Sequence, residues 1–395
     1  MKTRQWVGLL IVLLLGLALV WLAREPEQPG SHSLNPEAPS VLTRLLSDTG
    51  QTPQQRGHWA QARPDYQLQF PADHLAHNRF SIEWWYLTAN LTAVETGEHL
   101  GAQFTLFRRG LAVEGEQPSV QNPWQQPQLY MGHMALTDTA AGQHHSAQRL
   151  TRQGPGLAGS TAVPLAVWLE NWQLQAEQPE QLFPARLSSW DAEEQFGYQL
   201  RLTADKPLLL QGEQGYSTKH AAAGVGQPQG ASHYYSYTRL TVSGTVRKGE
   251  QQIEVRGQAW YDHEWTSSTL VAGQQGWDWF ALQLDDGRDL TAFRVRGEQG
   301  DHWQLALAGP EGERLAVDGK PRLTVLDHWR SDDGVQYPAR WRLQLAQPEL
   351  DIHIQPRLAD QEMKHMVRYW EGAVTVSGSQ SGQGYVELTG YDQGN

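Results

Sequence analysis

From Tyr66 onward, hydrophobic and polar residues alternate in short runs that are typical of β-strands. Eight segments rich in β-branched and aromatic residues carry this pattern: 104–107, 239–246, 252–261, 280–284, 290–296, 321–326, 340–345 and 385–391. Turn sequences such as Asp285-Asp286-Gly287 and Asp332-Asp333-Gly334 separate several of them. Beyond the N-terminal region, no stretch keeps a strong helical period for three turns. The sequence therefore predicts an all-β protein made of antiparallel barrels or sandwiches.

Two hydrophobic patterns occur twice in the same order. EWWYLTANL at 83–91 resembles GWDWFALQL at 276–284, and YSYTRLTVSG at 235–244 resembles YWEGAVTVSG at 369–378. The recurrence of both patterns in one order favours an internal repeat over a general likeness among β-strands. We therefore expect two homologous β-domains, one over residues 64–268 and the other over residues 269–395.

The first 24 residues have the pattern of a targeting segment. Lys2 and Arg4 precede an uncharged apolar run from Trp6 to Ala23, and Arg24 ends it. The run has about 18 residues, which is near the minimum that spans a bilayer and long for a signal-peptide core. The positive-inside rule places the rest of the chain outside the cytoplasm. We expect a signal anchor, or alternatively a cleaved signal peptide, followed by a flexible linker over residues 25–63 and a body at the periplasmic face of the inner membrane or secreted into the periplasm.

Composition excludes several classes of function. The chain has a formal net charge of −12, seventeen Trp and no Cys. Without Cys there is no disulfide, no thiolate nucleophile and no Cys-based metal site. The negative charge argues against nucleic acid as a partner, because phosphate binding needs a basic surface. No Gly-x-Ser-x-Gly motif is present, so a serine hydrolase is not expected.

The densest group of chemically active residues lies between Gly257 and Phe280. Residues 260–265 read WYDHEW, and Trp277 and Trp279 follow closely. This stretch falls at the junction of the two similar halves. We therefore expect the functional centre here.

The preceding hairpin suggests how this group is arranged. Arg247-Lys248-Gly249-Glu250 predicts a tight turn with Lys248 and Gly249 at its centre. Strand alternation then places Tyr237 opposite Trp260, Tyr235 opposite Asp262 and His233 opposite Glu264, all on one face. The other face would carry Leu240, Val242 and Val255, which suit a core. The first face would then point outward, unless Gly257 marks a bulge or the second domain covers it.

Such a group suits acid chemistry on an apolar substrate. A carboxyl group surrounded by indole and phenol rings is desolvated, which raises its pKa and keeps it a proton donor near neutral pH. Aromatic faces stabilise a developing cation by roughly 1–2 kcal/mol per ring. In this hypothesis Asp262 is the general acid, His233 is its partner or positions water, and the cation is stabilised by the rings of Tyr235, Tyr237 and Trp260. The substrate-binding candidates are Tyr237, Trp265, Trp277 and Trp279. The alternative is that these side chains are polar groups satisfied at a strand end, within an aromatic core.

Other titratable residues have structural explanations. Glu83 requires a buried partner such as Arg108. His133 is expected to anchor a turn through Asp138. Residues 262–264 alternate across a strand and therefore do not favour a metal site. We expect neither a metal nor a cofactor.

Several segments resemble the AttH and carotenoid 1,2-hydratase family, which is also described as lipocalin-like. They are FPADHLAHNRFSIEWWYLTANL (70–91), GAQFTLFRRG (101–110), HMALTD (133–138), AWYDHEW (259–265), GWDWFALQLDDGRDL (276–290) and YWEGAVTVSG (369–378). The resemblance covers residues 66–392 and implies two lipocalin-like β-barrel domains.

In the hydratase branch, which adds water to the terminal double bond of acyclic carotenes, the resemblance implicates His233 with Tyr235 and Trp260 with Asp262. Asp262 would be the proton donor. The AttH branch often accompanies ABC transporters. We therefore expect a protein that binds a hydrophobic lipid or isoprenoid and resembles a hydratase. The alternative is a non-catalytic lipid carrier that works with an ABC-type export system.

Overall fold

The computed structural model describes residues 59–112, 127–220, 230–268, 270–271 and 273–392. The described residues all belong to one compact unit. The predicted targeting segment and most of the predicted linker lie outside the described residues. Within the described ranges, no helix is long and apolar enough to cross a membrane.

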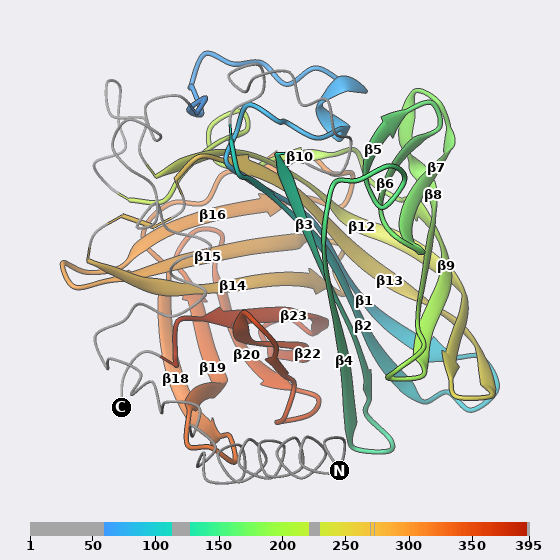
Figure 1. Cartoon of the computed structure of the whole chain (residues 1–395). Coiled ribbons are helices and arrows are strands. Elements are labelled where there is room, and N and C mark those ends of the chain that lie inside the picture. Colours follow the sequence, from blue (N-terminus) through green and yellow to red (C-terminus); the bar gives the residue numbers. More distant parts are fainter. Residues whose placement is uncertain (1–58, 113–126, 221–229, 269, 272, 393–395) are drawn as a thin grey trace, which may run out of the picture. The chain divides into compact units, whose positions relative to one another are not determined.

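The first sheet is antiparallel and takes its strands from the N-terminal part of the chain (Figure 1). These strands are β1 (Ile82–Ala93), β2 (His99–Gly110), β3 (Gln128–Asp138), β4 (Gln143–Arg152), β5 (Ala158–Ala162), β6 (Leu165–Leu169), β7 (Trp172–Gln178), β8 (Gln181–Asp191), β9 (Phe196–Ala204), β10 (Leu209–Leu210), β11 (Tyr216–Thr218), β12 (Ala231–Lys248) and β13 (Gln251–Thr266). The strand order is β4-β3-β2-β1-β13-β12-β9-β8-β7-β6-β5, and β10 and β11 also pair with β12. A short 3-10 helix, η2 (Ala72–His74), precedes β1.

The second sheet is also antiparallel. Its strands are β14 (Gln274–Leu284), β15 (Asp289–Gly297), β16 (His302–Ala308), β17 (Arg314–Leu315), β18 (Arg322–Arg330), β19 (Gln336–Leu345), β20 (Leu350–Pro356), β21 (Glu362–Lys364), β22 (Arg368–Gly378) and β23 (Gly382–Thr389). They follow the order β17-β16-β15-β14-β23-β22-β20-β19-β18, with β21 paired to β22. Each of the eight segments predicted from the sequence overlaps a strand of one of the two sheets.

The two sheets share a topology that matches the sequence repeat. Neighbouring strands run β3-β2-β1-β13-β12 in the first sheet and β16-β15-β14-β23-β22 in the second. The EWWY strand β1 and the GWDWF strand β14 therefore occupy equivalent places, and so do the two TVSG strands β12 and β22. The prediction of an all-β fold with two curled, near-barrel antiparallel sheets in tandem is confirmed. The domain boundaries stay a prediction.

Buried apolar side chains form two large clusters and several smaller ones. One large cluster belongs to the first sheet and includes Leu106, Val242 and Tyr261, and another belongs to the second sheet. Smaller clusters draw on both sheets, as where Tyr86 and Trp260 meet strands β14 and β22. Each sheet therefore buries one face in its own core and part of its other face against the partner sheet.

The register of the β12–β13 hairpin differs from the one predicted. Lys248 pairs with Gln251, so the turn residues are Gly249 and Glu250 rather than Lys248 and Gly249. A β-bulge between Tyr237 and Leu240 then shifts the register again. The bulge inserts an additional residue in β12. Every side chain of β12 on the N-terminal side of the bulge therefore points to the face of the sheet opposite to the one expected without it.

As a result, the predicted pairs are wrong. Tyr237 lies opposite Tyr261, Tyr235 opposite His263, and His233 opposite Trp265. These side chains point into the core of the first sheet. The opposite face of the hairpin carries Tyr234, Ser236, Trp260, Asp262 and Glu264. The question left open by the sequence is answered, because the second sheet covers this face.

Candidate functional site

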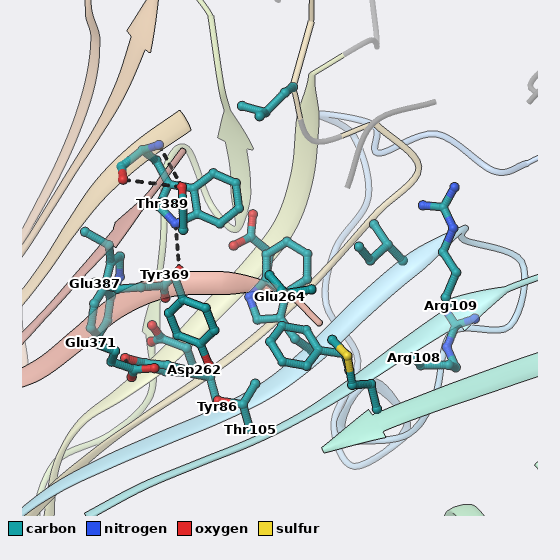
Figure 2. A pocket seen from close by; sticks show the side chains of 18 of the residues that line it. Tyr86, Thr105, Arg108, Arg109, Asp262, Glu264, Tyr369, Glu371, Glu387 and Thr389 are labelled. Carbon is teal, nitrogen blue, oxygen red and sulfur yellow. Dashed lines mark hydrogen bonds between the residues drawn. The ribbon is translucent and has the colours of Figure 1, made fainter. Parts of the chain in front are cut away.

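An apolar cavity of about 110 Å³ lies between the two sheets (Figure 2). Strands β1, β2, β3, β4, β12 and β13 line it from the first sheet, and β14, β15, β22 and β23 line it from the second. Its aromatic lining residues are Trp84, Tyr86, Phe107, Tyr234, Trp277, Trp279, Phe293 and Tyr369. Leu150 and Met366 also line it and remain 43% and 42% exposed, so they mark its opening to solvent.

Asp262 is a buried carboxyl group in the wall of this cavity. Ser236 Oγ, Tyr234 OH and Trp260 Nε1 donate hydrogen bonds to it at 2.5, 2.6 and 2.7 Å. Burial raises the pKa of Asp262 to about 7, and the three donors keep it from rising further. A carboxyl group with this pKa exchanges its proton near neutral pH.

The protons of these donors are already directed at Asp262. Ser236 Oγ accepts a hydrogen bond from Gln211 Nε2 at 2.8 Å, and Tyr234 OH accepts one from Trp279 Nε1 at 3.2 Å. Each hydroxyl therefore uses its own proton for the Asp262 carboxylate. This pattern stabilises Asp262 in its ionised form and explains why burial alone does not set its pKa.

Glu371 and Glu387 form a second acidic group in the cavity wall. They lie directly opposite each other on β22 and β23, where Glu371 is buried and Glu387 is half-buried. Tyr86 OH donates to Glu371 Oε1, and Trp277 Nε1 donates to Glu387 Oε1 at 2.9 Å. Burial, together with the charge of Glu387, raises the pKa of Glu371 well above its ordinary value. Burial raises that of Glu387 to about 7.

The fourth carboxylate of the cavity is neutralised. Lys219 Nζ lies 2.6 Å from Glu264 Oε1, and both side chains are almost fully buried. The ammonium also lies over the rings of Phe293 and Tyr234. Glu264 therefore serves as the partner of a buried cation, which leaves Asp262, Glu371 and Glu387 for proton transfer.

The structure brings together only part of the group predicted from the sequence. Asp262, Trp277 and Trp279 line the cavity, and Trp260 contacts Asp262 and packs edge-on against Trp279 at 6.3 Å between ring centroids. The predicted partnership of Asp262 with His233 is wrong, because the two lie on opposite faces of the hairpin.

The remaining predicted residues belong to the core face. His233 Nε2 accepts from the Arg63 backbone, and burial lowers the histidine pKa to about 4. Tyr235 OH lies 2.6 Å from His74 Nδ1, Tyr237 packs edge-on against Phe183, and Trp265 stacks on His77. None of His233, Tyr235, Tyr237 and Trp265 lines the cavity. The predicted places of His233, Tyr235 and Tyr237 beside Asp262 are therefore corrected, and Trp265, predicted to bind substrate, lies on the core face.

The core face has a buried ionic network centred on Glu83. Its Oε1 lies 2.7 Å from His77 Nδ1 and 2.8 Å from His263 Nε2, and its Oε2 lies 2.8 Å from Arg108 Nε. The predicted Glu83–Arg108 pair is thereby confirmed. Burial alone would raise the pKa of Glu83, but the charges of His77 and Arg108 hold it well below its ordinary value.

His77, Glu83 and His263 are also the group whose ligand atoms could surround a metal ion, within the part of the chain that the structure describes. Their atoms already contact one another at hydrogen-bond distance, and Arg108 adds a positive charge beside the carboxylate. The arrangement is that of a satisfied ionic network, in which a bound cation would compete with Arg108.

The sequence reading missed Tyr86, Tyr234, Glu371 and Glu387. The signal for Glu371 was a single carboxylate within the apolar segment WEGAV, and Glu387 stands in the similar segment YVELT. An acid at such a position requires a partner or a function. His133 was expected to bond Asp138, but it contacts Tyr369 and Gln148 instead.

Comparison with known proteins places the chain in a family. The AttH-like family model matches residues 61–391, so the chain belongs to the AttH-like family. The comparison with curated proteins found no match.

Two of the solved structures that match this chain show the shared fold. A protein from Nitrosomonas europaea described as AttH is 36% identical and has a TM-score of 0.71, with 84% of this chain and 99% of that chain covered. Kievitone hydratase from Nectria haematococca is 15% identical with a TM-score of 0.63, over 85% of this chain and 97% of that chain. At that identity, the second likeness shows the fold alone.

Proposed function

We propose that the protein adds water across a carbon–carbon double bond of an apolar small molecule bound between the sheets. The observation that carries this proposal is the Asp262 carboxyl group, which is buried in an aromatic cavity wall and has a pKa of about 7. Such a group can exchange a proton at neutral pH, as general acid–base catalysis requires. The surrounding indole and phenol rings can stabilise a carbocation.

Hydration needs two proton transfers and no oxidant or reductant. A carboxylic acid adds its proton to one alkene carbon, and the neighbouring carbon becomes a cation. Water attacks that carbon and forms a carbon–oxygen bond, and its surplus proton passes to a carboxylate. The product is an alcohol, and the total number of protons on the carboxyl groups is unchanged. Asp262, Glu371 and Glu387 supply the carboxyl groups of the cavity.

The size of the cavity limits what can react there. Its volume of about 110 Å³ is somewhat smaller than an engineered apolar cavity of roughly 150 Å³ that binds benzene. A branched alkene end of about one isoprene unit fits this space, whereas a whole lipid does not. We therefore propose an acyclic isoprenoid or similar lipid whose branched end enters the cavity while its remainder lies toward Leu150 and Met366.

Membership of the AttH-like family and a fold shared with kievitone hydratase support this class of reaction. The resemblance to carotenoid 1,2-hydratase supports a terminal isoprenoid double bond as the target. Of the two residue pairs that this resemblance implicated, Trp260 and Asp262 lie at the cavity wall, whereas His233 and Tyr235 face the core of the first sheet. The reaction proposed here accordingly depends on the carboxyl groups and rings of the cavity.

Two alkenes with a dimethylallyl end, citronellol and squalene, test the proposal. Each is incubated with the purified protein in ¹⁸O-labelled water, and mass spectrometry detects the alcohol. We expect label in a tertiary alcohol, a loss of about 10²–10⁴-fold in rate for Asp262→Asn, and an unchanged rate for Asp205→Asn, which alters an exposed aspartate. Absence of labelled product from the wild-type protein with both alkenes would contradict the proposal.

A non-catalytic carrier of lipids is the second candidate, favoured by the apolar lining and exposed apolar opening of the cavity. A carrier should bind citronellol without converting it, and Asp262→Asn should leave that affinity nearly unchanged. Native mass spectrometry of the protein purified from its host would identify the lipid. The export system as partner and the periplasmic location stay predictions.

A further inference from the structure

Glu371 presents an oxygen without a partner to the cavity. Its side chain is buried, with 2% of its surface exposed, and Oε1 accepts the proton of Tyr86 OH. Oε2 has no hydrogen-bond partner among the described residues. Leaving a buried carboxyl oxygen unpaired costs about 1–3 kcal/mol or more, so its persistence points to a partner that enters the cavity.

The neighbouring hydroxyl of Tyr369 gives no proton to this oxygen, because the hydrogen bonds of His133 commit the Tyr369 proton elsewhere, so Tyr369 can only accept a hydrogen bond from Glu371. Gln148 Oε1 accepts the Met366 backbone N–H at 3.0 Å, which fixes that oxygen as an acceptor. His133 Nε2 lies 3.1 Å from the same oxygen and must therefore carry a proton. Its Nδ1 is then an acceptor, and Tyr369 OH donates to it at 2.8 Å.

The neighbouring acid favours a proton on Glu371. Glu387 lies opposite Glu371 on the adjacent strand, and its Oε1 is held as an acceptor by Trp277. Two carboxylates side by side in an apolar wall cannot both ionise without strong repulsion. Tyr86, Tyr369 and Glu387 are the titratable groups that face Glu371 from β1, β22 and β23, and Asp262 lies across from Tyr86 on β13. No cation pairs with Glu371 among the described residues.

Asp262 has the opposite environment. Three donors supply protons to its oxygens, whereas the unpaired oxygen of Glu371 receives none. Tyr86 of β1 pairs with Asp262 of β13, and the Tyr86 hydroxyl donates to Glu371. Asp262 and Glu371 therefore border the same space (Figure 2). From this contrast we infer that Glu371 is the proton donor to the substrate alkene and that Asp262 is the carboxylate that takes the proton from water. This inference rests on the proposed function.

The two roles balance over one turnover. The O–H bond at Glu371 Oε2 breaks as a C–H bond forms at the alkene, which leaves a carbocation and a Glu371 carboxylate. Water then forms a C–O bond to the cation, and Asp262 accepts the proton that water loses. After release of the alcohol, transfer of one proton from Asp262 to Glu371, directly or through solvent, restores the starting state.

Citronellol in D₂O separates the two roles. If Glu371 is the donor, the Asp262→Asn variant should still exchange deuterium into the alkene, because the cation can return a proton to Glu371. Formation of the alcohol by this variant should fall by about 10²-fold or more. Glu371→Gln should lose both exchange and alcohol by a similar factor. Gln retains a carbonyl oxygen for Tyr86, and the melting temperature of each variant is compared with that of the wild type to verify folding.

The opposite pattern, with exchange kept in Glu371→Gln and lost in Asp262→Asn, would overturn the inference and leave hydration by this cavity intact. A wild-type protein that is inactive on citronellol and squalene overturns the proposed function, and the donor role falls with it.

A measurement without substrate tests the protonation itself. In protein labelled with ¹³C at the glutamate carboxyl carbons, we expect one resonance at the position of a protonated acid at neutral pH. This resonance should be missing in the Glu371→Gln variant. In the Glu387→Gln variant the same resonance should titrate at lower pH, because the charge of the Glu387 carboxylate has been removed. A Glu371 resonance at the ionised position at neutral pH would contradict the inference whatever the protein does to alkenes.

Discussion

Replacing Asp262 by Asn should remove a specific pH dependence from the stability of the fold. Asp262 has a pKa of about 7 in the folded protein, against 3.8 for an unperturbed aspartate. Between these values the folded state keeps a proton that the unfolded state releases. The stabilisation from this group is therefore fully present below about pH 3.8 and is lost as the pH rises toward 7.

The magnitude follows from the two pKa values. One unit corresponds to about 1.4 kcal/mol. Integrated between about pH 5 and about pH 8, the wild-type protein should lose about 2–3 kcal/mol of unfolding free energy through this group alone. Asn cannot ionise, so Asp262→Asn should escape this loss. The variant will also lose part of the hydrogen bonding to Ser236, Tyr234 and Trp260, but that loss is the same at both pH values and cancels in the comparison.

Urea unfolding at both pH values provides the test. For each protein, the change in unfolding free energy from the low to the high pH is measured. The change in Asp262→Asn is then subtracted from the change in the wild type. Asp205→Asn, at an exposed position, serves as the matched control and should behave like the wild type. If the wild type and Asp262→Asn lose the same free energy between the two pH values, then Asp262 is ionised throughout and the reasoning about the cavity wall is refuted.

Three further substitutions probe other parts of the structure. Glu83→Gln leaves the fully buried Arg108 without its counter-charge and should lower the unfolding free energy by about 3–5 kcal/mol, measured in urea. Gly257→Ala would place a Cβ 2.1 Å from the backbone oxygen of Asn90, so we expect a loss of about 1–3 kcal/mol or more, and a melting temperature equal to that of the wild type would contradict this packing. Met366→Asp puts a charge at the opening of the cavity and should weaken citronellol binding by about tenfold without lowering the melting temperature, as measured by calorimetry.

Local pattern was sufficient to predict the strands and one buried ion pair. Alternation of apolar and polar residues identifies a strand directly, because successive side chains point to opposite faces. The Glu83–Arg108 pair was predictable because a carboxylate among EWWY residues requires a cation, and Arg108 lies in the next strand with a matching face.

The candidate site was harder to predict because it depends on contacts between distant strands. Glu371 reaches Asp262's surroundings only through the packing of one sheet on the other, and no local pattern encodes that packing. The register error had a different cause. Nothing in the residues between Tyr237 and Leu240 marks a bulge, since no Gly or Pro is present there.

That bulge explains why two similar halves form different cavity walls. In the repeat, Tyr235 and Tyr237 align with Tyr369 and Glu371, and the TVSG valines face the core in both sheets. Strand β22 has no bulge in its pairing with β23, so Tyr369 and Glu371 face the cavity.

In β12 the additional residue turns Tyr235 and Tyr237 into the core, and it brings Tyr234 to the cavity and Ser236 to the same face, beside Asp262. These are the two hydroxyls that donate to Asp262. A one-residue insertion in one copy of the repeat therefore places hydroxyl donors around the acid of the first sheet, while Oε2 of the acid in the second sheet remains unpaired. Two carboxyl groups with different proton affinities, facing one apolar space, are what hydration of an alkene requires.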